Sequence, residues 1–346
     1  MQVIKTAVIL GLLISSLIAN AEGRGKAYVS NQEGGVSIIN LNTMETEGSI
    51  DIQAKNPRGI GITEDGHYLI TANKDDDNLS VIDLTTNQFV KHISVGKNPE
   101  FVRVFKGQVF VSTEPASTGK PPVAGQEDDK DEAKIPARIA VVDLAKGKKI
   151  REIIGGPETE GIEFSKSGKE IIVTNEADNT ITVHNFSSGK LLKTISTKKY
   201  GDRPRGIKVA PNGKYYVATL EMGNNFIVLD SQFKYLKTVA TGESPYGVSF
   251  DREGKRLFVA TSKAKTLEVY DTSNFEKIKE IPTGRRCWHF SFSPDDKDIL
   301  LACGKSDEVL VIDTEKLEVT KHIPNKEIPW GVVAYPKSMG SLDNAK

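Results

Sequence analysis

The sequence predicts an all-β protein: a seven-bladed β-propeller with four antiparallel strands in each blade and a last blade closed by strands from the N-terminus. Two observations carry this prediction. A unit of about 42 residues recurs along the chain. Each unit holds four short runs of β-branched and aromatic residues, separated by turn residues such as Gly, Asn and Asp. No helical period of useful length appears among the units, which excludes helical repeats of similar length.

The unit that begins at Arg58 shows the four strands most clearly. They are expected at Gly59–Ile62, Tyr68–Ala72, Leu79–Asp83 and Phe89–Val95. One aligned position opens the first strand of every unit: Gly59, Phe101, Gly161, Gly206, Gly247, His289 and Gly331. The steps between these positions are 42, 60, 45, 41, 42 and 42 residues, so six units are complete and a seventh is split.

The split unit closes the ring. Val332–Tyr335 supplies one strand from the C-terminal end, and Lys26–Ser30, Val36–Asn40 and Gly48–Ile52 supply three from the N-terminal end. Joining them in one blade leaves no unpaired strand edge between the ends of the chain, which removes an aggregation hazard.

The predicted domain organisation is a signal peptide at 1–21, a propeller at 22–336 and a flexible tail at 337–346. Lys5, the apolar stretch Thr6–Ile18 and the site Ala19-Asn20-Ala21 have the order of an export signal. An uncleaved anchor is the alternative. After cleavage we expect no membrane span and a periplasmic or secreted location. The 60-residue step between Phe101 and Gly161 reflects an acidic, Pro-rich loop insertion at 114–138, between the second and third strands of one blade.

The amino-acid composition limits the classes of binding partner that we expect. Lys+Arg and Asp+Glu each total 46 of the 346 residues, so the formal net charge is zero. A neutral chain has no long-range field to attract nucleic acid, and we therefore expect no nucleic-acid partner. Separately, we expect a monomer. The two cysteines rule out a disulfide-dense scaffold, and no Cys-x-x-Cys-His motif for covalent heme is present.

The residue just before each first strand marks a candidate ligand site. In a propeller these residues circle one mouth of the central channel, and here they are Arg58, Glu100, Glu160, Arg205, Tyr246, Trp288 and Trp330. The two arginines could hold a small anionic ligand, and the aromatic rings could stack on a flat group or a partner's side chain. Alternatively, these side chains pair with one another and plug the channel.

The ends of the second strands return to the same face and carry oxygen-bearing side chains. Asn73, Glu114 and Asn175 are the weak candidates for a metal, with calcium as the cation that prefers such ligands. No calcium-loop motif is present, and solvated acidic turns are the alternative. His289 stands where most units have Gly, and it is included in the mouth site and is the only channel candidate for a heme ligand.

Cys287 and Cys303 flank one predicted hairpin. Pairing around its turn places them nearly opposite each other, so that a cross-strand disulfide is possible in an oxidising compartment. Two reduced, buried thiols are the alternative.

The repeats resemble the YVTN β-propeller family. The resemblance rests on Tyr28-Val29-Ser30-Asn31, on Val173-Thr174-Asn175 and on the Pro-x-Gly joints. Within that family, Arg203-Pro204-Arg205-Gly206-Ile207 and Pro329-Trp330-Gly331-Val332 are similar to periplasmic propellers associated with alcohol catabolism that depends on pyrroloquinoline quinone (PQQ). The resemblance implies a setting beside quinoprotein dehydrogenases and no particular reaction. More distantly, the repeat is similar to heme-binding and lactonase propellers.

These observations lead us to predict a non-enzymatic periplasmic binding or scaffold protein, an accessory to PQQ-dependent alcohol oxidation that recognises a small anionic ligand or a protein partner at the channel mouth. No catalytic motif is visible in the sequence. The first alternative is a metal-dependent, lactonase-like hydrolase and the second a non-covalent heme-binding propeller. PQQ, calcium and heme are the cofactors considered, and no motif supports any of them.

Overall fold

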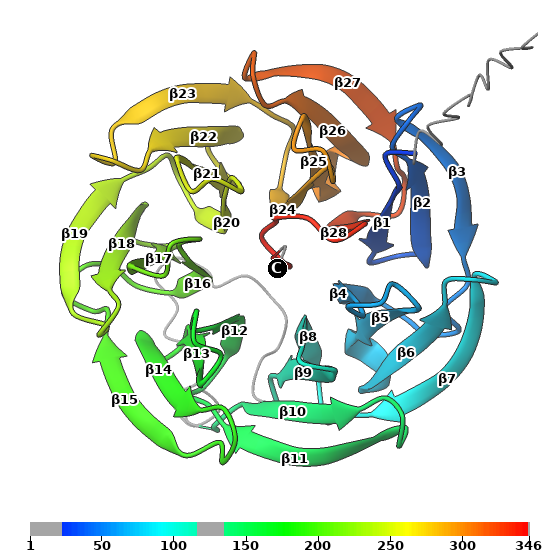
Figure 1. The fold of residues 1–346 in the computed structure, drawn as a ribbon, viewed down its shortest axis with the longest axis horizontal. Coiled ribbons are helices and arrows are strands. Elements are labelled where there is room, and N and C mark those ends of the chain that lie inside the picture. Colours follow the sequence, from blue (N-terminus) through cyan, green and yellow to red (C-terminus); the bar gives the residue numbers. More distant parts are fainter. Residues whose placement is uncertain (1–22, 116–134, 345–346) are drawn as a thin grey trace, which may run out of the picture.

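The computed structural model describes residues 23–115 and 135–344 and arranges them as seven blades around a central channel (Figure 1). Each blade is a four-stranded antiparallel sheet, so the predicted fold class is confirmed. The predicted signal peptide and most of the loop insertion 114–138 lie outside the described residues. None of the helices in the described part of the chain is long and apolar enough to cross a membrane.

The strands fall into four positions, from the channel outward. The first strands line the channel: β4 (Pro57–Ile62), β8 (Pro99–Phe105), β12 (Thr159–Phe164), β16 (Pro204–Val209), β20 (Pro245–Phe250), β24 (Cys287–Phe292) and β28 (Pro329–Tyr335). The second strands are β1 (Lys26–Asn31), β5 (Tyr68–Asn73), β9 (Gln108–Thr113), β13 (Glu170–Asn175), β17 (Tyr215–Leu220), β21 (Arg256–Thr261) and β25 (Asp298–Cys303).

The third strands are β2 (Val36–Asn40), β6 (Asn78–Asp83), β10 (Arg138–Asp143), β14 (Thr180–Asn185), β18 (Asn225–Asp230), β22 (Thr266–Asp271) and β26 (Glu308–Asp313). The fourth, solvent-facing strands are β3 (Glu45–Ile50), β7 (Gln88–Ser94), β11 (Lys148–Ile154), β15 (Leu191–Ser196), β19 (Tyr235–Ala240), β23 (Lys277–Pro282) and β27 (Glu318–Pro324). Two single 3-10 turns, η1 (Lys74–Asp76) and η3 (Gly304–Ser306), follow second strands.

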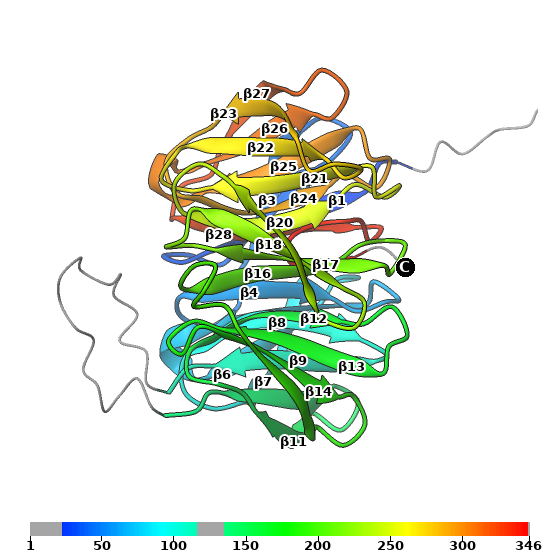
Figure 2. The same cartoon turned by 90° about the vertical axis from the view of Figure 1, so that its left-hand side faces the viewer.

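Strand β28 closes the ring as predicted. It pairs antiparallel with β1 in the register Tyr28↔Val333, so the blade order is β28-β1-β2-β3. Val29 and Val332 on these strands are fully buried. Seen from the side, the strands cross the thickness of the ring, so the two ends of every first strand reach opposite faces of the molecule (Figure 2).

Neighbouring first strands approach each other closely where a glycine follows the mouth residue. A Cβ atom at Gly59 would lie 2.5 Å from the carbonyl oxygen of Glu100, and one at Gly161 would lie 2.5 Å from that of Arg205. Any larger residue would therefore push the next blade away. The two units without this glycine carry Phe101 and His289, whose rings point into the channel with centroids 6.0 Å apart.

The C-terminal segment enters the channel from the other end. The sequence predicts a flexible tail at 337–346, whereas Ser338, Met339 and Leu342 are at most 6% exposed. The backbone N–H of Phe292 donates to the carbonyl of Met339 at 2.8 Å, and Ser341 N–H donates to the carbonyl of Phe290 at 2.9 Å. The segment runs from β28 across the centre of the ring (Figure 1). Its apolar residues fill space between the inner strands, a contact that sequence periodicity does not reveal.

Leu342 offers a direct test of this packing. We expect Leu342→Ala to lower the free energy of unfolding by about 2–4 kcal/mol, because it empties a fully buried site between first strands. Leu192→Ala is the matched control, since Leu192 is 54% exposed on β15, and it should change stability by less than about 0.5 kcal/mol. Urea unfolding measures both. Equal effects of the two variants would contradict a packed segment.

Candidate functional site

The seven predicted mouth residues surround one cavity. Each is the second residue of a first strand, and all seven line a cavity of about 500 Å³, a volume in the range of small-molecule sites. Glu100, Tyr246 and Trp330 are between 1% and 7% exposed, so this cavity lies inside the mouth rather than on its rim. The ring of residues predicted from the repeat is thus brought together at one place.

Ion pairs cross between blades in this ring. Arg58 Nη1 contacts Glu100 Oε1 of the next blade, and Arg205 Nη1 contacts Glu160 Oε1 of the preceding one. The Arg205 guanidinium also lies over the Tyr246 ring, 4.7 Å from its centroid. The sequence raised two alternatives, a ligand site and a channel plugged by paired side chains. The structure combines features of both, because the side chains pair with one another and still leave a cavity between them.

A second ring of charged residues was not predicted from the sequence. Arg203, two positions before Arg205, contacts Glu176 and lies 3.5 Å from Glu158. Glu221 accepts from Arg205 Nε at 2.7 Å. Glu176 and Glu221 directly follow second strands, where the sequence favours solvated acidic turns, but Glu176 is 2% exposed. Their partners lie on other strands, and those of Glu176 lie in the next blade, so a single unit of the repeat does not reveal them.

One sequence signal could have found part of this second ring. The residue two positions before each mouth residue has a positive φ of 50–59°: Asn56, Asn98, Glu158, Arg203, Ser244, Arg286 and Ile328. The left-handed conformation costs energy in residues other than glycine, and such strain gathers at ligand sites. Glu158, Arg203, Arg286 and Ile328 of this set line the cavity. Aligning one more position of the repeat would have shown them.

Three glutamates in the cavity have a buried oxygen atom without a hydrogen-bond partner among the described residues: Oε2 of Glu100, Oε1 of Glu114 and Oε1 of Glu176. The Glu176 oxygen is in ion-pair contact with Arg205 Nη1, whereas no such contact reaches the other two oxygens among the described residues. Burial raises the pKa of Glu100, although the Arg58 charge opposes the shift, and burial among Glu160 and Glu100 raises the pKa of Glu114 well above its usual range. Unpaired buried carboxyl groups with shifted pKa values are typical of functional sites.

The aromatic residues form a floor beneath these carboxyl groups. Trp288 and Trp330 line the cavity together with Tyr246. His289 lies below them and does not line it: its ring centroid is 4.4 Å from that of Trp330 and 5.3 Å from that of Tyr246. Its Nδ1 bonds Ser341 Oγ at 3.1 Å, and burial together with nearby positive charge lowers its pKa to about 3. The His289 ring is thus packed against its neighbours, and it is not exposed in the cavity where it could bind a heme iron.

The candidate metal residues do not form a metal site. Asn73 donates to Asn78 and Ser80, and Asn175 donates to Thr180 and Thr182, so both amides fix the turn between a second and a third strand. Only Glu114 of the three lines the cavity. Across residues 23–115 and 135–344, no group of three or more His, Cys, Asp or Glu side chains is placed to hold a metal ion.

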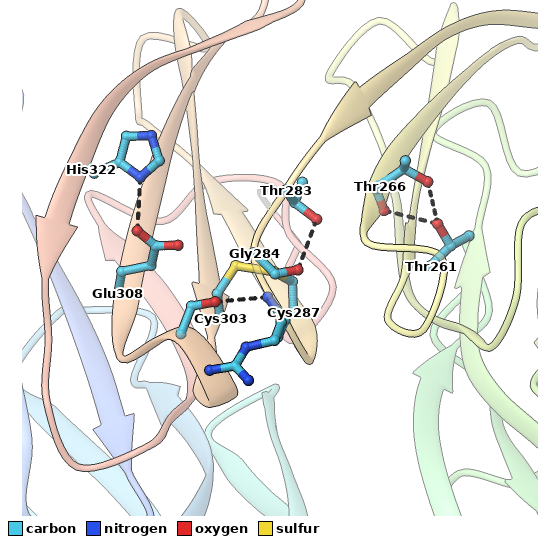
Figure 3. Close-up of a disulfide and its surroundings, with 10 residues drawn as sticks. Thr261, Thr266, Thr283, Gly284, Cys287, Cys303, Glu308 and His322 are labelled. Atoms are coloured by element: carbon cyan, nitrogen blue, oxygen red, sulfur yellow. Dashed lines mark hydrogen bonds and ion pairs between the residues drawn. A yellow bond between two sulfur atoms is a disulfide. The ribbon is translucent and has the colours of Figure 1, made fainter.

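A disulfide joins Cys287 and Cys303 beside the cavity (Figure 3). The S–S distance is 2.06 Å, and the two residues are register partners on β24 and β25. Both are buried, at 1% and 0% exposure. The bridge therefore fixes the strand ends that carry Trp288 on one side and Lys305 on the other, and both of these residues line the cavity.

A comparison with protein families gives one match. The family model "Lactonase, 7-bladed beta-propeller" matches residues 162–275, which is less than half of the chain. The matched segment contains Arg203, Arg205 and Tyr246 of the cavity. No curated protein sequence matches the chain.

Solved structures of propellers are similar to this chain throughout its length. Hydrazine synthase of Kuenenia stuttgartiensis has a TM-score of 0.72 at 19% identity, covering 84% of this chain and 92% of the other. A protein of Bacteroides uniformis named as a candidate 6-phosphogluconolactonase has a TM-score of 0.72 at 16% identity, covering 90% and 99%. A periplasmic gluconolactonase of Pseudomonas aeruginosa has a TM-score of 0.72 at 14% identity, covering 90% and 98%. At these identities the likeness shows the fold.

These comparisons contradict the prediction of a non-enzymatic binding or scaffold protein that serves PQQ-dependent oxidation. The family-model match and the neighbours named as lactonases favour the lactonase-like alternative. The prediction went wrong because it looked for a catalytic motif within one stretch of sequence. In a propeller the side chains of one cavity come from several blades, so no local motif marks them.

The charge state of Glu114 can be tested through stability. Its raised pKa means that the native state keeps a proton that the unfolded state releases, so this stabilising effect is complete below the ordinary glutamate pKa and is lost as the pH rises. We expect Glu114→Gln to be more stable than the wild type at pH 8 and no more stable near pH 4, as measured by urea unfolding. The exposed Glu318 provides the control Glu318→Gln, which should show no such trend. A difference between Glu114→Gln and wild type that does not vary with pH would contradict the buried, protonated carboxyl.

Proposed function

We propose that the protein is a lactonase-like hydrolase that opens the ring of a sugar lactone in the cavity at the channel mouth. The observation that carries the proposal is the pair Glu100 and Glu114, which present unpartnered oxygens to one cavity and have raised pKa values. The match of residues 162–275 to the seven-bladed lactonase model supports the same reaction class.

Lactone hydrolysis needs a base, an acid and a group that stabilises negative charge. A water molecule attacks the carbonyl carbon and gives up a proton, and the bond to the ring oxygen then breaks as that oxygen gains a proton. The product is an open-chain hydroxy acid. General acid–base catalysis of this kind works best when the pKa values of the groups lie near the working pH, which burial of a carboxyl group achieves.

Glu100 suits the role of base. One oxygen is held by Arg58, which fixes the carboxylate, and the other is free to accept a proton from water. Glu114 suits the role of acid, because burial raises its pKa and so favours the protonated form, which can donate to the leaving ring oxygen. Two carboxyl groups with different environments can thus divide the proton transfers.

Arg205 and Tyr246 are placed to stabilise the developing oxyanion. Arg205 Nη1 lies 3.3 Å from the Tyr246 hydroxyl. The pKa of Tyr246 is raised well above its usual range by burial, so the phenol remains a hydrogen-bond donor throughout the working pH range. Fixed donors in a buried site stabilise charge that forms during a reaction.

The charges of the cavity favour an anionic substrate. Six cations line it: Arg58, Arg203, Arg205, Lys263, Arg286 and Lys305. Six glutamates line it as well: Glu100, Glu114, Glu158, Glu160, Glu176 and Glu221. Burial raises the pKa of Glu114 and disfavours its negative charge, which tips this balance toward the cations. The resulting positive charge, together with Trp288 and Trp330 as stacking surfaces for a sugar ring, points to a lactone that carries a phosphate or carboxylate.

The carboxylates of the cavity do not fit a mechanism in which a bound metal ion assists lactone hydrolysis. The carboxylates Glu100, Glu160 and Glu176 are each in contact with a guanidinium, which already neutralises the charge that would attract a divalent cation. The proposed steps therefore use the carboxyl groups themselves.

The proposal includes a cellular location for this activity. The export-type segment at 1–21 and the disulfide between Cys287 and Cys303 support a periplasmic or secreted enzyme, because such bridges persist in oxidising compartments. The chain would then act as a member of the YVTN-type propellers on lactones outside the cytoplasm.

Substitution of the two carboxyl groups tests the proposed chemistry. Glu100→Gln and Glu114→Gln should each lower kcat/KM by about 10²–10⁴-fold, since each removes one proton transfer. The assay is hydrolysis of glucono-1,5-lactone and of its 6-phosphate followed by pH-stat. In the wild type, activity should rise with pH as Glu100 loses its proton and fall again as Glu114 loses its proton. Both the rise and the fall should occur at a pH above the ordinary glutamate pKa.

Glu253→Gln is the control for that assay, because Glu253 is exposed in a turn at the opposite face. It should leave kcat/KM unchanged. Folded wild-type protein that hydrolyses neither lactone above the uncatalysed rate would refute the activity, and full activity in Glu100→Gln would refute the assignment of the base.

Chelation separates the two versions of the mechanism. We expect dialysis against EDTA to leave both the lactonase rate and the melting temperature unchanged, because the cavity carboxylates are held by arginines. A rate lost with EDTA and restored by a divalent cation would show that a metal takes part after all.

A further inference from the structure

A second cavity of about 390 Å³ lies at the opposite mouth of the channel. It is formed where the strands β8, β12 and β16 end, beside the C-terminal segment. The first cavity lies at the beginning of the same strands. Because the two ends of these strands reach opposite faces of the ring (Figure 2), the two cavities lie on opposite faces. None of the residues of the proposed lactonase site lines this second cavity.

Arg103 is the unusual group in the second cavity. It is 3% exposed, and its Nη2 donates to Glu163 Oε1 at 3.2 Å. Its Nε and Nη1 have no hydrogen-bond acceptor among the described residues. A buried guanidinium with unsatisfied donors costs free energy, and an anion in the adjoining cavity would remove that cost.

Three carboxylates line the cavity, and among the described residues only one of them is a partner of Arg103. Glu64 has an Oε1 without a hydrogen-bond partner and makes no hydrogen bond or ion pair with Arg103 in the described part of the chain, and the other two carboxylates are shared with other groups. Glu163 accepts from Asn344 Nδ2 at 3.0 Å and from the backbone N–H of Phe164 at 2.7 Å. Asp343 lies 3.2 Å from Lys337 Nζ. Lys208 Nζ donates to the carbonyl of Asp343 and to Asn344 Oδ1, both at 2.9 Å. The polar residues around Arg103 thus form a built network with one cation left incompletely matched.

One side of the cavity wall is apolar and aromatic. Phe105 stacks on Phe164 with ring centroids 4.1 Å apart and an interplanar angle of 11°. Val209, Pro211 and Met339 complete this side. A hydrated ion such as phosphate would gain nothing from such a wall, whereas an apolar group attached to the anion would be buried against it.

We propose that this second cavity binds a small monocarboxylate with an apolar or aromatic body, with the carboxylate on Arg103 and the body against Phe105 and Phe164. A single cation with unused donors matches one negative charge, and the aromatic pair selects for an apolar body. The site is separate from the proposed lactonase cavity and does not depend on that activity.

Phenylacetate is the probe for this proposal, measured by isothermal titration calorimetry on the purified protein. A ligand of ~10 non-hydrogen atoms should bind with a dissociation constant on the order of 1 mM or tighter. Three comparison compounds each lack one required feature: 2-phenylethanol has no carboxylate, gluconate has no apolar body, and inorganic phosphate has neither a carboxylate nor an apolar body. We expect none of them to bind with an affinity within tenfold of that of phenylacetate.

Two variants locate the contact. Arg103→Gln should weaken phenylacetate binding at least tenfold, whereas Arg252→Gln should not, because Arg252 lines the same cavity but is bonded to Asp296. Should Arg103→Gln fail to fold, Phe105→Ala provides the test through the aromatic wall and should also weaken binding. Glu100→Gln should bind phenylacetate as the wild type does, whatever its effect on lactone hydrolysis.

Three results would overturn the proposal. The first is no saturable binding of phenylacetate to folded protein at 20 mM. The second is an unchanged affinity in Arg103→Gln or Phe105→Ala. The third is equal binding of phosphate or gluconate, which would show a general anion site without selection for an apolar body.

Discussion

The structure of the mouth depends on one hydroxyl group in the second strand of several blades. Thr174 Oγ1 accepts from the N–H of Gly161 at 2.8 Å in its own blade and donates to the carbonyl of Arg205 in the next at 2.5 Å. Thr219 makes the same pair of contacts with Gly206 and the carbonyl of Tyr246. The hydroxyl therefore ties the mouth residues Arg205 and Tyr246 to the neighbouring blade, and Ser30 Oγ does the same for the carbonyl of Arg58. The strand register shifts at this point, so the hydroxyl also satisfies an N–H that the sheet leaves free.

This tie has an electrostatic consequence. Once the mouth residues are fixed side by side, their charges are buried together and have to be neutralised locally, because an unpaired buried charge is far more costly than a paired one. Arg205 accordingly touches Glu160 and Glu176 from the preceding blade and Glu221 from its own blade. Glu100 has one arginine, whereas Glu114 accepts a hydrogen bond from none of the described side chains. Burial raises the pKa values of both, and nearby positive charge only partly opposes that shift. The proposed acid and base are thus the carboxyl groups that the arginine network does not fully neutralise.

The repeat period was enough to predict the ring, its closure through β28 and the seven mouth positions, because each of these depends on residues at a fixed spacing. What it could not predict were contacts between blades. Glu176 reads as a solvated turn until Arg203 and Arg205 are placed beside it. The segment after β28 has no strand pattern, and its burial depends on a channel whose width no single unit determines. Likewise, Arg103 occupies an ordinary strand position, and only the ring places it beside Lys208 and Glu163.

The same first strands give the molecule two distinct faces because the channel between them is filled. Phe101 and His289 occupy the positions where other blades carry glycine, and the His289 ring bonds to Ser341 of the C-terminal segment. Leu342 fills the space beside Gly331. With this plug in place, a ligand in either cavity meets side chains from only one end of the strands. The near mouth combines arginines with carboxyl groups, and the far mouth combines the buried Arg103 with an aromatic wall, so the two proposed sites present different chemistry to their ligands.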